Sequence, residues 1–506
     1  MENHLKHSSL QKRTDQFLHS PHLFGLTLLI ILASYAFLHY LASYTLPVPW
    51  PDEAHFLWQA EGFAEHGSLF APELNPDRTI LWMPPGYMLI LGGITKIFGL
   101  SLTVARTCSL LTMIGVIALM AALARRFGHP WLAVLPIALF FLGPPGVAAG
   151  NVARMEAMLL LFVLGGFYFL QRERIAIGLG ILALTPLIHP NGAFFLVAGG
   201  IAGIILLILK GRWQKPTRGE LVFVVAVILA WSAYAAYVGI HWHDFLQDMA
   251  MQFQRKLDRP YWQDVVLARS KGLLIATSLA SIYCLIRKMP ALLLVGIGVP
   301  AWWIGTTGGE MWYSIFNSLA YCSALLLFVF VAAQMIADRV WERFRSILWL
   351  VVPVYACYVL TWNLLKVSEP QPLLFVDSRP WYNMSASAEP YINRDDILSV
   401  QATFATRIPF EHKASIEFFP EGDAFFFSRR RSENVLFSCP LFCERNSDWY
   451  LFHLSSRTPP ALSWLGEVKL QKLRIQAADL PRYLIHTRGT SDRWYLIPGK
   501  AARGLR

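Results

Sequence analysis

The sequence predicts a polytopic α-helical membrane protein with a soluble mixed α/β domain at its C-terminus. Of its 506 residues, 55% are hydrophobic and only 15% are charged, whereas soluble domains contain about 25% charged residues. The charge is also uneven, since residues 1–366 contain 44 charged residues (12%) and residues 367–506 contain 33 (24%). We therefore expect a transmembrane domain over 1–366 and a soluble domain over 367–506.

The net charge of +11 does not by itself indicate a nucleic-acid-binding protein. Polytopic membrane proteins collect Lys and Arg in their cytoplasmic loops, which accounts for a basic balance without nucleic acid. The high hydrophobicity and low charge also exclude an intrinsically disordered chain. We expect membrane lipids, and no nucleic acid, among the partners.

Eleven apolar runs are long enough to cross a hydrocarbon core of about 30 Å. The first begins near His22 and is long enough to span, so we expect it to be retained as a helix rather than cleaved as a signal. A further run at 84–100 is ambiguous, because it starts with two prolines and contains several glycines. The eleven runs lie at 22–44, 103–124, 130–148, 155–170, 174–189, 191–210, 220–239, 270–286, 290–306, 311–335 and 346–365.

The distribution of basic residues decides the ambiguity of 84–100. If this run lies at the interface without spanning, one set of short loops contains 16 Lys and Arg residues and the opposite set contains 8. If it spans, that bias collapses. The positive-inside rule therefore favours about 11 transmembrane helices, with a juxtamembrane helix in the first outer loop. The N-terminus is then cytoplasmic, and the loops 45–102 and 240–269 lie outside with the C-terminal domain.

The C-terminal domain shows the short apolar runs that are typical of strands. The segments 449–454 and 493–497 are rich in aromatic and branched residues and are bounded by polar residues and glycine. Cys439 and Cys443 are four residues apart, a spacing that fits no common zinc or redox motif. They could form a short disulfide if the domain lies outside the cytosol.

Acidic residues concentrate in the first outer loop, which holds 6 of the 18 acids in residues 1–366. Asp52 and Glu53 follow Pro51 a few residues after the first span. Such a pair can hold a metal, or one member can act as a base with a tuned pKa. Equally, Pro51, Asp52 and Glu53 can form the acidic first turn of a short surface helix.

Two more ionisable residues lie at predicted outer ends of apolar helices. Glu156 is at the mouth of the run 155–170, where ionisable groups are costly and often functional. Arg154 is two residues away, so on one helix the two side chains would diverge. Alternatively, Glu156 is an interfacial residue that pairs with an arginine from elsewhere. His189 ends the run 174–189 before Pro190, and it is either a ligand-binding or a structural residue.

Basic and aromatic residues on the outer side could contact a lipid or a sugar. Arg106 begins the second span, and Arg255, Lys256 and Arg259 lie in the loop 240–269. They could bind lipid phosphate or simply anchor the loop at the interface. Tyr87 and neighbouring tryptophans form an interfacial belt or, in part, stack on sugar rings. The sequence contains no P-loop, dinucleotide fingerprint, nucleophile elbow or HExxH motif.

In this order and spacing, the motifs of residues 20–210 resemble those of the GT-C class of polyprenyl-phosphate-sugar-dependent membrane glycosyltransferases. The protein O-mannosyltransferase-like and lipid A aminoarabinose transferase-like groups are the most similar. The motifs are Trp50-Pro51-Asp52-Glu53, Trp82-Met83-Pro84-Pro85-Gly86-Tyr87, Phe98-Gly99, Ala105-Arg106, Ala124-Arg125-Arg126-Phe127-Gly128, Ala153-Arg154-Met155-Glu156, Gly178-Leu179-Gly180 and His189-Pro190.

The resemblance implies a GT-C-like fold with an active site in the first outer loop. It places the catalytic acid at Asp52 with Glu53 beside it, the second acidic position at Glu156, and the arginine that begins the second span at Arg106. Many members have Lys or His before the Pro-Pro pair to meet the donor phosphate. This chain has Met83 there, so the contact is expected from His189, Lys256 or Arg259.

These observations together lead us to expect inverting transfer of a sugar from a polyprenyl-phosphate donor to a hydroxyl of a glycan, lipid or protein. Asp52 would act as base, Arg106 and the basic loop would stabilise the leaving phosphate, and Glu53 and Glu156 would orient the acceptor. Asp52 and Glu156 could also hold a divalent cation. The expected location is a bacterial inner membrane with the C-terminal domain in the periplasm. A lipid or solute transporter, or a membrane scaffold, is the alternative.

Overall fold

The structure is a computed structural model, and most of the chain up to residue 337 is described. The segment 346–365, the last predicted span, lies outside the described residues, as do Cys439 and Cys443. The described residues are 21–42, 51–71, 78–125, 130–210, 215–257, 262–307, 313–337, 387, 389–391, 397–401, 415–419, 449–455, 479–488 and 492–502.

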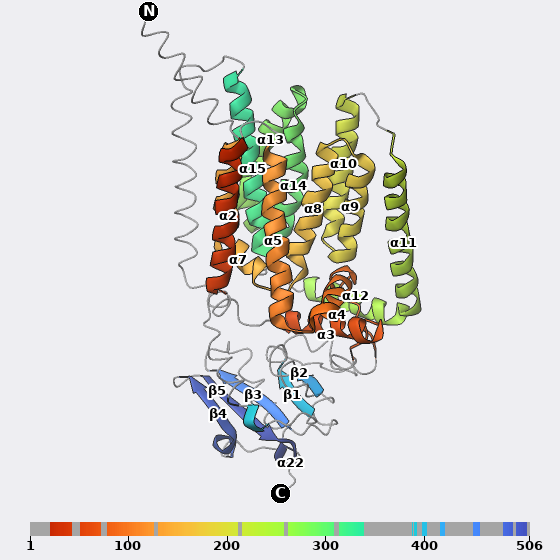
Figure 1. Ribbon diagram of the computed structural model, residues 1–506, viewed down its shortest axis with the longest axis vertical. Coiled ribbons are helices and arrows are strands. Elements are labelled where there is room, and N and C mark those ends of the chain that lie inside the picture. The colour runs from red at the N-terminus through yellow and green to blue at the C-terminus, as the bar shows by residue number, and fades with distance from the viewer. Residues whose placement is uncertain are drawn as a thin grey trace, which may run out of the picture.

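Long apolar helices run side by side and form the bundle in Figure 1. Nine of the predicted apolar runs coincide with one of these helices each, because uninterrupted apolar residues satisfy their backbone hydrogen bonds internally. These nine helices are α2 (Pro21–Ala42), α5 (Leu102–Arg125), α8 (Met155–Gln171), α9 (Ile175–Ile188), α10 (Gly192–Lys210), α11 (Arg218–Ile240), α13 (Trp262–Ile286), α14 (Leu293–Thr307) and α15 (Ser314–Ala337), and α6 (Pro130–Phe141) packs among them.

The run 130–148 differs from the prediction of a single span. It divides into α6 and the seven-residue helix α7 (Pro144–Gly150). The break follows from Pro144 and Pro145, which lack a backbone N–H and clash with the preceding turn. Tyr35 on α2 fixes α7 in place, because its hydroxyl donates to the carbonyl oxygen of Gly146 at 2.6 Å. The chain therefore reverses beside α8 instead of continuing straight.

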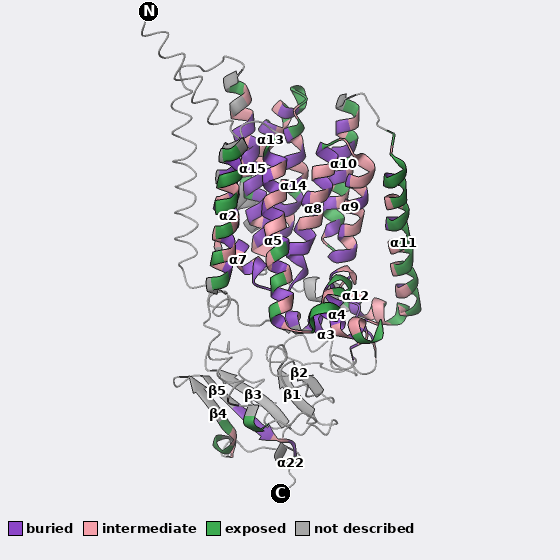
Figure 2. Cartoon of the chain, in the orientation of Figure 1, coloured by how far each residue is buried: buried purple, intermediate pink, exposed green. Residues whose placement is uncertain are grey.

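Within the described residues, three helices are long and apolar enough to cross a membrane by length and composition: Leu102–Arg125, Arg218–Ile240 and Ser314–Ala332. The other apolar helices are shorter. Buried residues collect between α5, α8, α14 and α15, whereas α11 is largely exposed (Figure 2). The exposed side chains of α11 are mainly branched aliphatic residues such as Leu221, Val225 and Ile228. An apolar outer surface of this kind fits a hydrocarbon surrounding and indicates a membrane protein.

Three further helices lie across one end of the bundle: α3 (Pro51–His66), α4 (Gly86–Phe98) and α12 (Trp242–Leu257) (Figure 1). The 13 residues of α4 cover about 20 Å, which is too short for a hydrocarbon core of about 30 Å. The run 84–100 therefore forms a helix at the bundle end, as the charge distribution predicts for an interfacial segment.

Two glycines allow α4 to approach its neighbours closely. A Cβ at Gly92 would lie 2.7 Å from the carbonyl oxygen of Ala60 in α3, and one at Gly86 would lie 2.6 Å from the carbonyl oxygen of Leu187 in α9. The Pro-Pro-Gly-Tyr motif therefore has a packing role. Gly86 seats the start of α4 on the end of α9, next to His189.

The C-terminal part contains a five-stranded mixed sheet in the order β2-β1-β3-β5-β4. Strand β1 is parallel to β2 and β3, while β5 is antiparallel to both β3 and β4. The two segments singled out by composition are β3 and β5. The strands are β1 (Ile397–Gln401), β2 (Ser415–Phe419), β3 (Trp449–Ser455), β4 (Leu484–Arg488) and β5 (Asp492–Pro498), followed by the short helix α22 (Gly499–Ala502).

The close approach at Gly86 leads to a prediction about stability. We expect Gly86→Ala to lower the free energy of unfolding by about 1–3 kcal/mol, because the added methyl meets a backbone carbonyl that cannot move cheaply. Gly93→Ala on the same helix is the matched control, since nothing lies within 4 Å of a Cβ there. Thermal unfolding in detergent measures both. Equal unfolding temperatures for the two variants would contradict the assignment.

Candidate active site

Glu53, in the first turn of α3, is a fully buried carboxylate at this end of the bundle. Its side chain is 0% exposed and pairs bidentately with Arg106 of α5, with Nε–Oε1 at 2.9 Å and Nη2–Oε2 at 2.8 Å. The backbone N–H of Ala153 also donates to Oε1 at 2.8 Å. Glu53 thus joins the start of α3, the start of α5 and the loop between α7 and α8. Because both its oxygens accept hydrogen bonds, Glu53 holds the surrounding segments in place and acts as an anchor.

Arg154 brings Asp52 and Glu156 together. Its guanidinium forms an ion pair with Asp52 on α3 and a second, at 2.8 Å from Nη2 to Oε1, with Glu156 on α8. The expectation that Arg154 and Glu156 diverge is wrong. Arg154 is the N-cap of α8 with an extended backbone (φ −133°, ψ 162°), so its side chain can turn back onto the first helical turn.

Asp52 is the carboxylate of this cluster that solvent reaches best. Its side chain is 19% exposed, compared with 0% for Glu53 and 4% for Glu156. A buried charge is tolerated only when it is paired and hydrogen-bonded, and Arg106 and Arg154 provide that pairing here. Asp52 is therefore held in place on one side and open on the other, an arrangement that suits a group that meets a substrate.

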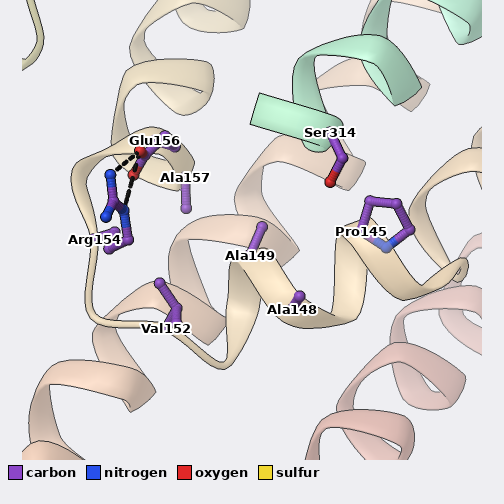
Figure 3. A pocket seen from close by; sticks show the side chains of 8 residues that line it. All are labelled: Pro145, Ala148, Ala149, Val152, Arg154, Glu156, Ala157 and Ser314. Atoms are coloured by element: carbon purple, nitrogen blue, oxygen red, sulfur yellow. Dashed lines mark hydrogen bonds and ion pairs between the residues drawn. The ribbon is translucent and has the colours of Figure 1, made fainter. Parts of the chain in front are cut away.

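A narrow pocket adjoins the Arg154–Glu156 pair (Figure 3). It encloses about 280 Å³ of space that contains no atoms, part of it open solvent. Its α7 side is apolar and made of small residues, whereas its α8 side carries the ion pair. It is lined by Pro145, Ala148, Ala149, Val152, Arg154, Glu156, Ala157 and Ser314.

His189 and Tyr313 complete the surroundings of the pair. The ring of His189 meets that of Tyr313 edge to face at 6.3 Å, and its Nδ1 accepts the backbone N–H of Asn191 at 3.0 Å. His189 is close enough to interact electrostatically with Glu156, and Tyr313 with Arg154. The sequence analysis missed Tyr313, because an aromatic residue at a helix start carries no signal that separates it from the interfacial belt.

The segment 78–82 supports α3 from the other side. Trp82 Nε1 donates to His55 Nε2 at 2.7 Å, and Gln59 Nε2 donates to the carbonyl oxygen of Ile80 at 2.8 Å. Tyr87 is 1% exposed and packs edge to face on Phe56 at 5.7 Å. The structure therefore places Tyr87 beneath α3 as a packing residue.

The remaining predicted residues are only partly located. Arg255 and Lys256 lie on the last turn of α12, but their side chains and Arg259 are outside the described part of the chain. Among the residues that the structure describes, no three His, Cys, Asp or Glu side chains gather as a metal site. The guanidinium of Arg154 lies between Asp52 and Glu156, so a cation shared by these two carboxylates would have to displace it.

The buried Glu53–Arg106 pair leads to a prediction about stability. We expect Glu53→Gln to lower the free energy of unfolding by about 3–5 kcal/mol, because it leaves the guanidinium of Arg106 buried without its counter-charge. Glu65→Gln, on the same helix with a side chain that is 59% exposed, should change it by less than about 0.5 kcal/mol. Chemical denaturation measures both. A small effect of Glu53→Gln would show that the pair is not an anchor.

His55 predicts a dependence of stability on pH. Burial, with a contribution from nearby Arg78, lowers the pKa of His55 to about 3, whereas an unfolded histidine has a pKa of about 6.5. Between these two pKa values, His55 is protonated in the unfolded chain and neutral in the folded chain. The free energy of unfolding should therefore fall below pH 6.5, by up to about 1.4 kcal/mol per pH unit.

We expect His55→Gln to remove this part of the acid sensitivity, while His66→Gln, whose side chain is 71% exposed, keeps it. Unfolding temperatures at pH 5 and pH 7 give the comparison. The same pH difference in all three proteins would overturn the assignment.

No protein-family model matches this chain, and no curated protein sequence matches it. Solved structures do. The chain is similar to ArnT from Cupriavidus metallidurans bound to undecaprenyl phosphate, with a TM-score of 0.56 and 13% sequence identity over 92% of this chain and 97% of that one.

The apo state of the same ArnT gives a TM-score of 0.53 and 12% identity, covering 94% of this chain and 98% of that one. Identities this low establish the fold alone. The chain therefore has a GT-C-like membrane fold, which is the fold that its motifs resemble.

Proposed function

We propose that this protein transfers a sugar from a polyprenyl-phosphate-linked donor to a hydroxyl group of an acceptor at the membrane surface. The observation that carries the proposal is the cluster of Asp52, Arg154 and Glu156, which stands beside α3 at the bundle end. This cluster lies within the fold of a protein that has been seen with undecaprenyl phosphate. A lipid-linked donor needs a reactive site where the bundle meets the membrane surface.

The roles follow from exposure and charge. The accessible carboxylate of Asp52 takes the proton from the acceptor hydroxyl. The oxygen then attacks the anomeric carbon from the face opposite the phosphate, the bond from that carbon to the phosphate oxygen breaks, and polyprenyl phosphate leaves. Attack from the opposite face inverts the anomeric centre.

Charge on the leaving phosphate requires a cation nearby. Arg154 is better placed for this than Arg106, because it lines the pocket and is itself a partner of the proposed base Asp52. As negative charge moves from Asp52 to the phosphate, Arg154 can exchange one partner for the other. His189 and the basic residues Arg255, Lys256 and Arg259 are further candidates for the phosphate contact, in the absence of a basic residue at Met83.

The sidedness of the site follows from the loops. Helices of the bundle alternate in direction, so α5, α8, α10 and α13 all end opposite α3 and α4 (Figure 1). Each of these ends carries or precedes a basic residue: Arg125, Arg172, Lys210 and Arg287. The positive-inside rule assigns that end to the cytoplasm. We propose a bacterial inner membrane, with the site and the C-terminal domain on the periplasmic side. The acceptor is a glycan, a lipid or a protein of the envelope.

The decisive experiment is a transfer assay with purified protein in detergent or nanodiscs, using a polyprenyl-phosphate sugar with a labelled sugar and envelope acceptors. We expect Asp52→Asn to lower the transfer rate by about 10²–10⁴-fold, because the acceptor loses its base. Glu65→Gln on the same helix is the control and should transfer at the wild-type rate.

Unfolding temperature must be measured in parallel, because Asp52→Asn also removes a partner of Arg154. Full transfer by a folded Asp52→Asn protein would disprove the mechanism. Movement of the labelled lipid between membrane leaflets without transfer would instead identify a transporter, and the absence of both activities would favour a scaffold.

A further inference from the structure

A further buried ion pair lies outside the candidate active site. Asp248 of α12 is 0% exposed and receives two hydrogen bonds from Arg78, at 3.0 Å from Nη1 to Oδ2 and 2.6 Å from Nη2 to Oδ1. The backbone N–H of Leu81 also donates to Oδ2, at 2.6 Å. Nothing in the reaction described above uses Asp248, yet its carboxylate is fully withdrawn from solvent.

Asp248 connects α12 with the first outer loop. Helix α12 follows the outlying helix α11, and it exposes Trp242 and Leu246 while it turns Asp248 inward. The pair therefore joins two segments about 170 positions apart in sequence. A paired, hydrogen-bonded carboxylate with this burial specifies one arrangement of the two segments, because any shift would leave a charge buried without its partner.

The segment that Asp248 holds is also the one that supports α3. Asp248 fixes the backbone at Leu81, and the neighbouring positions on either side make the contacts to α3. The carbonyl oxygen of Ile80 accepts from Gln59, and the indole of Trp82 donates to His55. His55 follows Asp52 by three residues, so these contacts act on the same helical turn as the proposed base.

We infer that Asp248 is a positioning residue that sets the place of Asp52 through the segment 78–82 and α3. The inference rests on the proposed function, since it concerns the base of that reaction. A base must be held at hydrogen-bond distance from the acceptor, and a displacement of about 1 Å can cost a factor of up to about 100 in rate. Asp248 does not touch the substrate and acts only through α3.

The test is a double-mutant cycle in the transfer assay. We expect Asp248→Asn to lower kcat by about ten-fold or more, with little change in KM for the polyprenyl-phosphate sugar, because alignment is lost while donor binding remains. In the Asp52→Asn background, Asp248→Asn should have no further effect on the residual rate. Equal effects in both backgrounds, or a change in KM alone, would overturn the inference.

The matched control is Asp244→Asn, one turn earlier on α12. Asp244 is 21% exposed, and its nearest approach to His241 is a long 3.9 Å. Its replacement should therefore leave kcat unchanged. If Asp248→Asn does not fold, Arg78→Lys is the alternative variant. It keeps the positive charge but loses the planar two-point contact, and it should lower kcat in the same selective manner.

Hydrogen exchange provides a readout that does not require activity. In the folded variants we expect faster amide exchange at 53–62 and 80–82 for Asp248→Asn, and no change for Asp244→Asn. Unchanged exchange in α3 would overturn the coupling even if transfer were observed. If wild-type protein shows no transfer but exchange in α3 still depends on Asp248, the proposed function fails while the mechanical link stands.

Discussion

The salt bridge between Glu53 and Arg106 is the contact on which the bundle end depends. A carboxylate without exposure is stable as an ion only where a cation and hydrogen-bond donors meet it. Arg106 and the backbone N–H of Ala153 come from two different parts of the chain and satisfy both oxygens. The start of α3, the start of α5 and the loop before α8 are therefore fixed relative to one another. The position of Asp52 is therefore set by its neighbour Glu53.

Around this anchor, the charged side chains form an inner set and an outer set that differ in their exposure to solvent. Glu53 and Arg106 form the inner pair, while Arg154 forms an outer link between Asp52 and Glu156. The inner pair is closed on all sides, and the outer link borders a pocket. Two adjacent acids at one helix start thus differ in exposure and partners, which suits Glu53 to a structural role and Asp52 to the chemical role proposed above.

Much of the fold was predictable from local sequence. Apolar runs of sufficient length predict helices because the period and the hydropathy lie within one segment, and the basic loops predicted that 84–100 lies at the interface. The break between α6 and α7 follows from Pro144 and Pro145, whereas the apolar run alone predicts one continuous span. The candidate acids Asp52 and Glu156 were also found from the sequence, because few acids lie so close to apolar helices.

The pairings could not be predicted in the same way. Glu53 and Arg106 are 53 positions apart, and Arg78 and Asp248 are 170 apart. A single sequence carries no signal for which buried charges meet. The Arg154–Glu156 contact differs from the prediction for a more local reason. In a regular helix, side chains two residues apart point in different directions, but α8 begins one residue after Arg154, so this rule does not apply to the pair.

The short helix α6 has a consequence for chemical selectivity. Its 12 residues cover about 18 Å, so the chain turns into α7 after about half the length of the neighbouring α5, which has 24 residues. The apolar wall of the pocket beside Arg154 is built from this early turn, with Pro145, Ala148 and Ala149. In the proposed reaction, water is the smallest nucleophile that competes with the acceptor for the sugar, and an apolar wall limits its supply. The same proline pair that interrupts a predicted span would then favour the proposed transfer over hydrolysis of the donor.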